Sequence, residues 1–212
     1  MIGRLPDFDA EKSAFFFSKL RLVCEKYREL GKHFYHTFVD NKKCFDRVWQ
    51  DGLWAVMRRL NIDRGIVNSI EALYKVSRSV VMAGGDYSDC FPTSVGVRQG
   101  CLLSPTLCNI FLENIMRETL TVHQETSIKI AGRPVNHLQF ADDVDLIDGC
   151  KGDQEVKVNQ LDFISRRYGM EISLEKTKTL ISGVPEEVKV CVRGTELGQV
   201  TEFTYFGSVE TE

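Results

Sequence analysis

Two adjacent aspartates, Asp142 and Asp143, lie between two short apolar stretches of the chain. Residues 138–141 precede them and residues 144–147 follow, and each stretch has the length of a β-strand. The pattern therefore predicts a hairpin that carries two acids at its tip. Neighbouring carboxylates in an apolar setting repel each other and lose hydration. A divalent cation compensates both effects, and Mg²⁺ prefers carboxylate oxygens as ligands.

A third aspartate, Asp40, ends an earlier apolar stretch, residues 36–39. Two strand ends that each present an aspartate could share a pair of metal ions. Two ions about 3.5–4 Å apart stabilise both the attacking and the leaving oxygen of a phosphoryl transfer, which is the chemistry of a nucleotide polymerase. Taken alone, an Asp-Asp pair is more often a turn, because Asp bonds its own backbone there. The order of the remaining motifs decides between the two interpretations.

The composition is that of an ordinary globular protein of 212 residues with 43% hydrophobic residues. The sequence contains neither an apolar run long enough to cross a bilayer nor the layout of a signal peptide. Seven cysteines without CxxC spacing indicate free thiols in a reducing compartment, and therefore an intracellular protein, nuclear or cytoplasmic. The net charge of −3 is unusual for a nucleic-acid binder, although residues 1–80 carry 15 Lys and Arg against 10 Asp and Glu.

Hydrophobic periodicity predicts an α+β fold, in which an antiparallel sheet is backed by helices on one face and leaves the other face open for substrate. We expect Asp63 and Ser104 to cap helices, Asp46 to cap the helix after it, and His36 to be an ordinary strand residue. The expected helices are residues 12–30, 52–60, 64–75, 105–120 and 153–168. The expected strands and hairpins are residues 34–40, 79–91, 127–135, 138–147, 178–182, 188–192 and 202–206.

From about Lys19 to Gly207 the sequence resembles the reverse transcriptases of non-LTR (LINE-type) retrotransposons. Five segments carry the resemblance, in the order and with the spacing of that family. They are a first catalytic motif at Phe38–Asp46, a nucleotide-handling motif at Gly96–Pro105, a metal-binding hairpin at Phe140–Asp143, a fourth motif at Gly169–Lys178 and a primer-gripping motif at Phe203–Gly207. One Asp-Asp pair is weak evidence, whereas five ordered motifs are strong evidence.

The resemblance implies a polymerase palm-like fold and RNA-directed DNA synthesis from dNTPs on an RNA template and a DNA primer. The implied cofactor is a pair of Mg²⁺ ions, with Mn²⁺ as a substitute. Asp40 and Asp142 are the implied catalytic residues that bridge the ions. Asp143 is the third acid, either a ligand in some states or a residue behind the ligands.

The resemblance also assigns residues to nucleotide and primer binding. Phe45 would exclude a ribose 2′-hydroxyl and so select deoxynucleotides, although a core phenylalanine is an equally good interpretation of this residue alone. The other nucleotide-binding residues are Arg98 for phosphate, Gln99 and Gly100 for sugar or base, and Lys176 for pyrophosphate. Tyr205, Phe206 and Gly207 would support the primer.

The resemblance places the domain boundaries as follows. Residues 1–11 are expected to be disordered or a remnant segment, residues 12–200 to form the palm domain, and residues 201–212 to begin a truncated primer-grip or thumb region. The fingers and thumb of the family are expected to be absent from this chain. Five residues depart from the family pattern: Asn41, Cys44, Leu102, Cys108 and Asp145. Asp145 would add a fourth repelling acid near the hairpin.

Two rivals to this interpretation remain. The first is a catalytically inactive retroelement remnant or interaction module, which retains the carboxylates by descent. The second is another palm-type enzyme, such as an RNA-dependent RNA polymerase, against which Phe45 argues. Neither rival requires a membrane partner.

Overall fold

The structure, a computed structural model, describes residues 22, 25–27, 29, 31–121, 128–130, 133–182, 188–205 and 208–211. Its centre is a five-stranded sheet with the strand order β13-β10-β1-β9-β8. The strands are β1 (Phe34–Val39), β8 (His137–Phe140), β9 (Asp143–Asp148), β10 (Lys178–Ser182) and β13 (Gly198–Val200). Strand β1 lies in the middle and pairs antiparallel with both β9 and β10.

The edge strand β13 departs from the antiparallel sheet that the sequence predicts, because it pairs parallel to β10. Two consecutive strands can pair in parallel only if the chain between them returns to the end of the sheet where the first strand began. Here the crossing contains a short hairpin, β11 (Cys191–Val192) with β12 (Thr195–Glu196), which packs against helix α6 (Lys151–Arg167).

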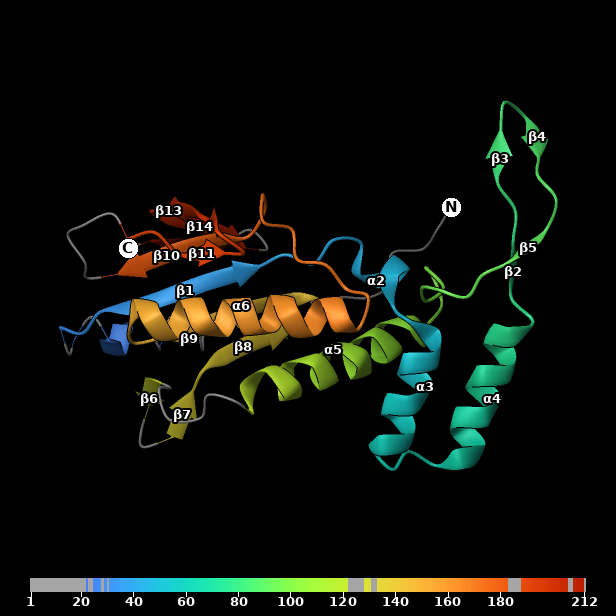
Figure 1. Cartoon of the computed structure of the whole chain (residues 1–212), viewed down its shortest axis with the longest axis horizontal. Helices are drawn as coiled ribbons and strands as arrows, with labels where there is room; N and C mark the ends of the chain where they lie inside the picture. Colours follow the sequence, from blue (N-terminus) through green and yellow to red (C-terminus); the bar gives the residue numbers. More distant parts are fainter. Residues whose placement is uncertain are drawn as a thin grey trace.

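Helices α6 and α5 (Ser104–Leu120) form the second layer (Figure 1). Helix α6 contacts β1 and β9, and α5 packs against α6. Apolar residues recur at the spacing of one helical face on both helices, and this face is buried. They are Leu107, Phe111 and Ile115 on α5, and Val158, Leu161 and Ile164 on α6.

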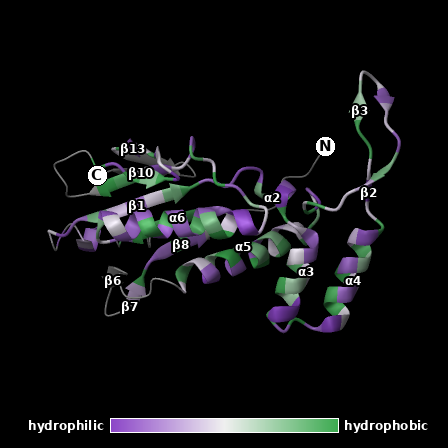
Figure 2. Cartoon of the chain, in the orientation of Figure 1, coloured by the Kyte–Doolittle hydropathy of each residue, from purple (hydrophilic) through white to green (hydrophobic). Residues whose placement is uncertain are grey.

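Two amphipathic helices, α3 (Gln50–Arg59) and α4 (Arg64–Lys75), lie beyond α5, and both show mixed green and purple surfaces in Figure 2. Asp63 caps α4 as predicted, since its carboxylate accepts hydrogen bonds from the backbone of Gly65 and Ile66. Two other predicted caps are wrong. Ser104 is the first residue of α5 and its hydroxyl donates to the carbonyl of Arg98. Asp46 lies inside α2 (Cys44–Arg47), and α3 begins without a side-chain cap.

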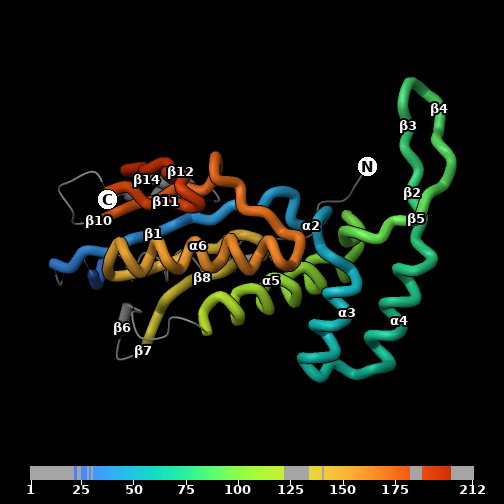
Figure 3. Tube along the Cα trace, in the orientation of Figure 1, coloured from blue at the N-terminus to red at the C-terminus, as the bar shows by residue number. Residues whose placement is uncertain are grey.

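The predicted hairpin after α4 is confirmed, and Figure 3 shows that it projects away from the body of the protein. Its strands are β2 (Arg78–Ser79), β3 (Met82–Ala83), β4 (Asp86–Tyr87) and β5 (Phe91–Pro92). Gly84 and Gly85 make the turn with positive φ angles, which glycine adopts without strain. Two more hairpins are β6 (Ile128–Ile130) with β7 (Arg133–Val135), and β14 (Glu202–Tyr205) with β15 (Ser208–Thr211).

The sheet face opposite α6 is partly covered, whereas the sequence predicted an open face. Tyr27 packs there with Phe34, Phe38, Ile147 and Leu180 in a second, smaller core. The predicted helix 12–30 is helical at residues 22, 25–27 and 29, and its other residues, like segment 1–11, lie outside the described part. No helix among the described residues is both long and apolar enough to cross a membrane.

Candidate active site

The carboxylate-bearing ends of β1 and β9 lie side by side. Val39 pairs with Val144 in the antiparallel register, so one further step places Asp40 opposite Asp143. Asn41 closes this corner, because its Nδ2 donates to the carbonyl oxygen of Asp142 at 3.1 Å. The structure thus brings Asp40 close to the adjacent pair Asp142 and Asp143, which follow it about a hundred residues later in the sequence.

Asp40 and Asp143 share one face of the sheet. Alternate residues of a strand point to opposite faces, and Val39 and Val144 belong to the core under α6. Asp40 and Asp143 therefore lie on the face opposite α6. Burial, followed by the negative charges of Asp142 and Asp40, raises the pKa of Asp143 from 3.8 to about 7. The site is thus a place where negative charge is costly and a cation is favoured.

This raised pKa predicts a pH-dependent stability. Asp143 binds its proton more tightly in the folded state, so the free energy of unfolding should fall as pH rises from about 4 through about 7, at which half of the folded molecules have lost this proton, and should level off above that. Asp143→Asn removes the charge and should flatten this decline. The measurement is the melting temperature across that pH range in a chelating buffer. Asp51→Asn, at an exposed position of α3, should keep the wild-type slope; equal slopes for Asp143→Asn and wild type would refute the assignment.

The fourth motif is bound to the segment around Asp40. The backbone NH of Ser173 donates to the Asp40 carbonyl at 2.8 Å, and the Asp40 NH donates to Thr177 Oγ1 at 3.3 Å. Glu171 forms an ion pair with Lys42 at 2.6 Å. Lys176 lies in this loop with an exposed side chain, so its assignment to pyrophosphate remains a prediction.

Phe45 lies beside the nucleotide-handling motif. It lines a hollow of about 390 Å³ together with Gln99, Gly100, Cys101, Leu102, Ser104 and Pro105. The NH of Val97 donates to the Phe45 carbonyl at 2.8 Å, which ties the two motifs together. Gly100 has a φ angle of +79°, a conformation that favours glycine. Apart from its two neighbours in the chain, no described residue has an atom within 4 Å of where the Cβ of residue 100 would be. This backbone leaves room for a ligand.

Arg98 and Gln99 are both held by protein groups. Arg98 donates from Nε to Ser77 Oγ at 3.2 Å and from Nη2 to the Leu73 carbonyl at 2.8 Å, and its guanidinium lies over the ring of Tyr74. Gln99 Nε2 donates to Asp46 Oδ1 at 3.0 Å. These bonds shape the loop, and the binding of phosphate by Arg98 and of sugar or base by Gln99 remain predictions.

Cys44 and Cys108, two residues that depart from the family pattern, contact each other. The Sγ atoms of Cys44 and Cys108 are 3.2 Å apart, and both side chains are buried between α2 and α5. The hydrogen bond with Cys108, followed by burial, raises the pKa of the Cys44 thiol. Cys44 is therefore a neutral residue that packs against Cys108 beneath the candidate site.

The predicted primer-contacting residues are only partly described. Tyr205 is the last residue of β14 and pairs with Ser208 of β15. Phe206 and Gly207 lie outside the described residues, so the primer assignment of all three remains a prediction.

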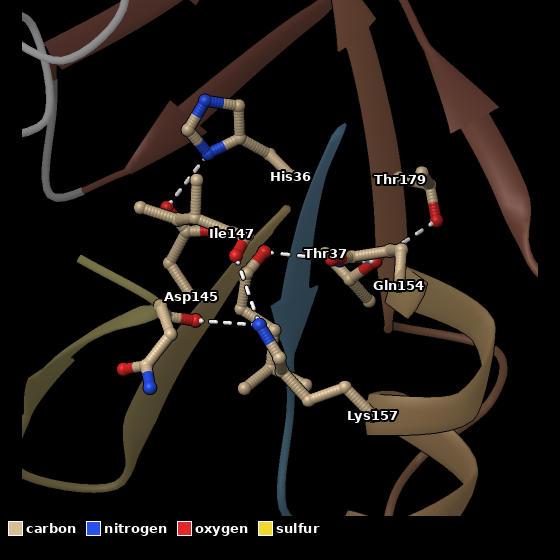
Figure 4. A network of polar contacts seen from close by, with 9 residues as sticks. His36, Thr37, Asp145, Ile147, Gln154, Lys157 and Thr179 are labelled. Atoms are coloured by element: carbon tan, nitrogen blue, oxygen red, sulfur yellow. Dashed lines mark hydrogen bonds and ion pairs between the residues drawn. The ribbon is translucent and has the colours of Figure 1, made fainter. Parts of the chain in front are cut away.

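Asp145 does not add an uncompensated acid to the site, which corrects the expectation from the sequence. Its Oδ2 lies 2.8 Å from Nδ1 of His36, and both side chains are buried (Figure 4). Burial raises the pKa of Asp145, while His36 opposes that shift. His36 is therefore the partner of a buried acid and more than an ordinary strand residue. Its position on the same face as Asp145 follows from the register, which only the fold reveals.

Other polar groups join α6 to the sheet, and sequence reasoning missed them. Gln154 Nε2 donates to Thr37 Oγ1 at 2.6 Å and to the Leu146 carbonyl at 3.0 Å. In Figure 4 the side chain of Lys157 extends from α6 to the strands, where Nζ lies 2.6 Å from Asp148 Oδ2. The sequence contains a signal for these contacts, because Gln154 and Lys157 are polar residues on the same helical face as Val158 and Leu161.

The donor chemistry of the three acids suits Mg²⁺. Carboxylate oxygens are its preferred protein ligands, and burial together with the charges of Asp142 and Asp40 raises the pKa of Asp143, so that a cation here would be favoured. Among the described residues, no group of three or more His, Cys, Asp or Glu side chains is arranged as a complete metal-binding cluster.

A family model described as reverse transcriptase (RNA-dependent DNA polymerase) matches residues 2–209. The chain belongs to the reverse transcriptase family. It is 27% identical over 165 residues to the Pol polyprotein of the type-2 retrotransposable element R2DM of Drosophila melanogaster, covering 76% of this chain and 15% of that protein. It is 24% identical over 204 residues to the Pol polyprotein of an R2 element of Nasonia vitripennis, covering 91% and 20%. This reverse transcriptase chain thus spans no more than a fifth of either relative's length.

Solved structures share the fold of this reverse transcriptase chain. Apo telomerase from Candida tropicalis superimposes with a TM-score of 0.66 at 16% identity, covering 96% of this chain and 36% of that one. A form of the same telomerase truncated from its C-terminal domain gives 0.62 at 19%, covering 99% and 40%. The resemblance to non-LTR retrotransposon reverse transcriptases and the palm-like α+β fold are therefore both confirmed.

Proposed function

We propose that the chain is the palm of an RNA-directed DNA polymerase that joins a deoxynucleotide to a primer 3′-hydroxyl. The observation that carries this proposal is the convergence of Asp40, Asp142 and Asp143 at adjoining strand ends. Family membership supports the same activity. Residues 12–200 would form the palm, and residues 201–212 would begin the primer-contacting region.

In this proposal Asp40 and Asp142 hold two Mg²⁺ ions, for which Mn²⁺ can substitute, and Asp143 serves as an additional ligand or as a nearby negative charge. Bound ions lower the pKa of the primer hydroxyl and neutralise charge on the leaving pyrophosphate. The fold supplies the positioning. Hydrogen bonds from Ser173 and to Thr177 fix the backbone of Asp40, while β1–β9 pairing aligns it with Asp143.

The hollow beside Phe45 is the proposed dNTP site. Gly100 allows close approach of the backbone, and Gln99 lines the same hollow. Lys176 lies on the loop that is hydrogen-bonded to the backbone of Asp40, and it is the proposed proton donor or phosphate contact for pyrophosphate. The proposed macromolecular partners are an RNA template and a DNA primer, and the proposed location is intracellular, nuclear or cytoplasmic.

Phe45→Ala should weaken the selection of deoxyribonucleotides over ribonucleotides. If the Phe45 ring blocks a ribose 2′-hydroxyl, its removal should lower the preference for dNTP over NTP at least about tenfold, the scale on which pocket sterics discriminate. The measurement is the ratio of kcat/KM for dGTP and GTP in single-nucleotide extension. Tyr87→Ala, on the exposed projecting hairpin, is the matched aromatic control. An unchanged ratio in an active, folded variant would identify Phe45 as a packing residue only.

Primer extension tests the function itself. The full chain is incubated with an RNA template annealed to a DNA primer, Mg²⁺ and dNTPs, and extended primer is the expected product. Incorporation should stop on chelation and return with Mg²⁺ or Mn²⁺. No extension at high protein concentration would favour an inactive remnant, and preference for ribonucleotides would favour an RNA polymerase.

A further inference from the structure

The outer side of α6 is fastened to the β11–β12 hairpin by its own polar side chains. Glu155 Oε1 accepts a hydrogen bond from the NH of Cys191 at 3.0 Å. Asn159 donates from Nδ2 to the Cys191 carbonyl at 2.8 Å and accepts from the NH of Arg193 at 3.1 Å. These bonds bring Arg193 over the C-terminal half of α6.

A hollow of about 500 Å³ lies where α6 and this hairpin meet. It contains three arginines and an aromatic ring, and Phe163 is 58% exposed, which is unusual for so large an apolar side chain. The guanidinium of Arg167 lies 6.0 Å from the centre of the Phe163 ring. The residues that line the hollow are Asn159, Asp162, Phe163, Arg166, Arg167 and Arg193.

Asp162 gives the hollow an unused hydrogen-bond acceptor. The residue is only 3% exposed, and its Oδ2 pairs with Arg193 Nε at 3.1 Å. Its Oδ1 is buried and has no hydrogen-bond partner within the described part of the chain. An unsatisfied buried carboxylate oxygen is costly, so a ligand that donates a hydrogen bond here would be favoured.

This surface is separate from the candidate active site. Helix α6 packs on one face of the sheet, with Val158 and Leu161 in the same core as Val144. Asp40 and Asp143 lie on the opposite face. A second hollow, of about 580 Å³ beside Gly152, Glu155, Val156, Asn159 and Gln160, continues the surface along α6.

We propose that this outer surface of α6 binds single-stranded RNA away from the active site. Arg166, Arg167 and Arg193 would contact phosphates, and a base would stack on Phe163, the combination that binds unpaired strands. Asp162 Oδ1 would accept a hydrogen bond from a ribose 2′-hydroxyl, which DNA lacks. An acidic peptide would satisfy the arginines but supplies neither the stacking base nor that hydroxyl. The proposal does not depend on polymerase activity.

Binding of a fluorescent 12-nucleotide oligouridine to the full chain, measured by anisotropy, tests the proposal. Phe163→Ala should weaken binding about tenfold, as loss of one stacked base does. Arg166→Ala/Arg167→Ala should weaken binding at least as much. The double variant should also reduce the slope of log affinity against log salt concentration by the amount expected for the loss of about two phosphate contacts. Asp162→Asn should reduce the preference for oligouridine over oligothymidine, with a melting curve confirming that the variant is folded.

Arg64→Ala/Arg117→Ala, which removes two exposed arginines from α4 and α5, is the matched control and should bind as wild type does. Photo-crosslinking of 4-thiouridine RNA should label the peptide that contains Phe163. Wild-type affinity in both α6 variants, or crosslinks confined to the peptide of Asp142, would overturn the proposal. Displacement of the RNA by polyglutamate at equal charge would instead assign the surface to acidic peptides.

Discussion

Asp142→Asn is expected to lower nucleotide incorporation about 10³-fold while leaving the fold intact. Metal ions contribute several kcal/mol to the stabilisation of a phosphoryl-transfer transition state, and about 4 kcal/mol corresponds to this factor. Asparagine keeps the shape of the side chain but removes the charge that would hold the ion. The reduced repulsion on Asp143 should at the same time raise the melting temperature above pH 7. Single-turnover primer extension and thermal melting measure the two effects.

Asp40→Asn should cause a loss of similar size, because the two acids would hold the same pair of ions. The double variant should be little worse than either single one, since groups that act as a unit are not additive. Asp51→Asn, on the exposed side of α3, should retain wild-type activity. If Asp142→Asn incorporates nucleotides as wild type does, the carboxylates are not the catalytic centre.

Lys157→Met is expected to destabilise the protein by roughly 3–5 kcal/mol, the cost of leaving a buried charge without its partner. Lys157 and Asp148 are 1% and 0% exposed, and their charged atoms are 2.6 Å apart. Lys157 Nζ also donates to the Ile147 carbonyl at 3.0 Å. For a chain of this size the melting temperature should fall by about 10 °C. Urea denaturation gives the free energy directly.

The double variant Lys157→Met/Asp148→Leu should recover most of the loss, because apolar residues of similar volume can replace a buried ion pair. Arg117→Met provides the exposed comparison. It breaks the Arg117–Glu113 pair on α5, where the arginine is 63% exposed, and should cost less than about 1 kcal/mol. A double variant as unstable as Lys157→Met would show that lost packing, rather than the unpaired charge, is responsible.

The local elements could be predicted from the sequence where a short-range physical rule governs them. The apolar runs before and after Asp142 formed the expected hairpin, and the helices predicted at residues 105–120 and 153–168 formed as α5 and α6. Asp63 caps α4 because an N-cap needs only its own neighbours in the chain. The cap predicted at Ser104 failed because the hydroxyl found a partner in the preceding loop.

The pattern of predicted helices and strands specified the α+β class, and the order of the motifs specified the three candidate acids. Both depend on residue type and on spacing along the chain. Long-range pairing decided the rest. The match of His36 with Asp145 depends on the β1–β9 register, the contact of Cys44 with Cys108 on how α2 meets α5, and the hollow at Asp162 on the docking of Arg193. Burial makes such pairings costly to break, because a partner left alone is buried without compensation, and burial exists only after the chain has folded.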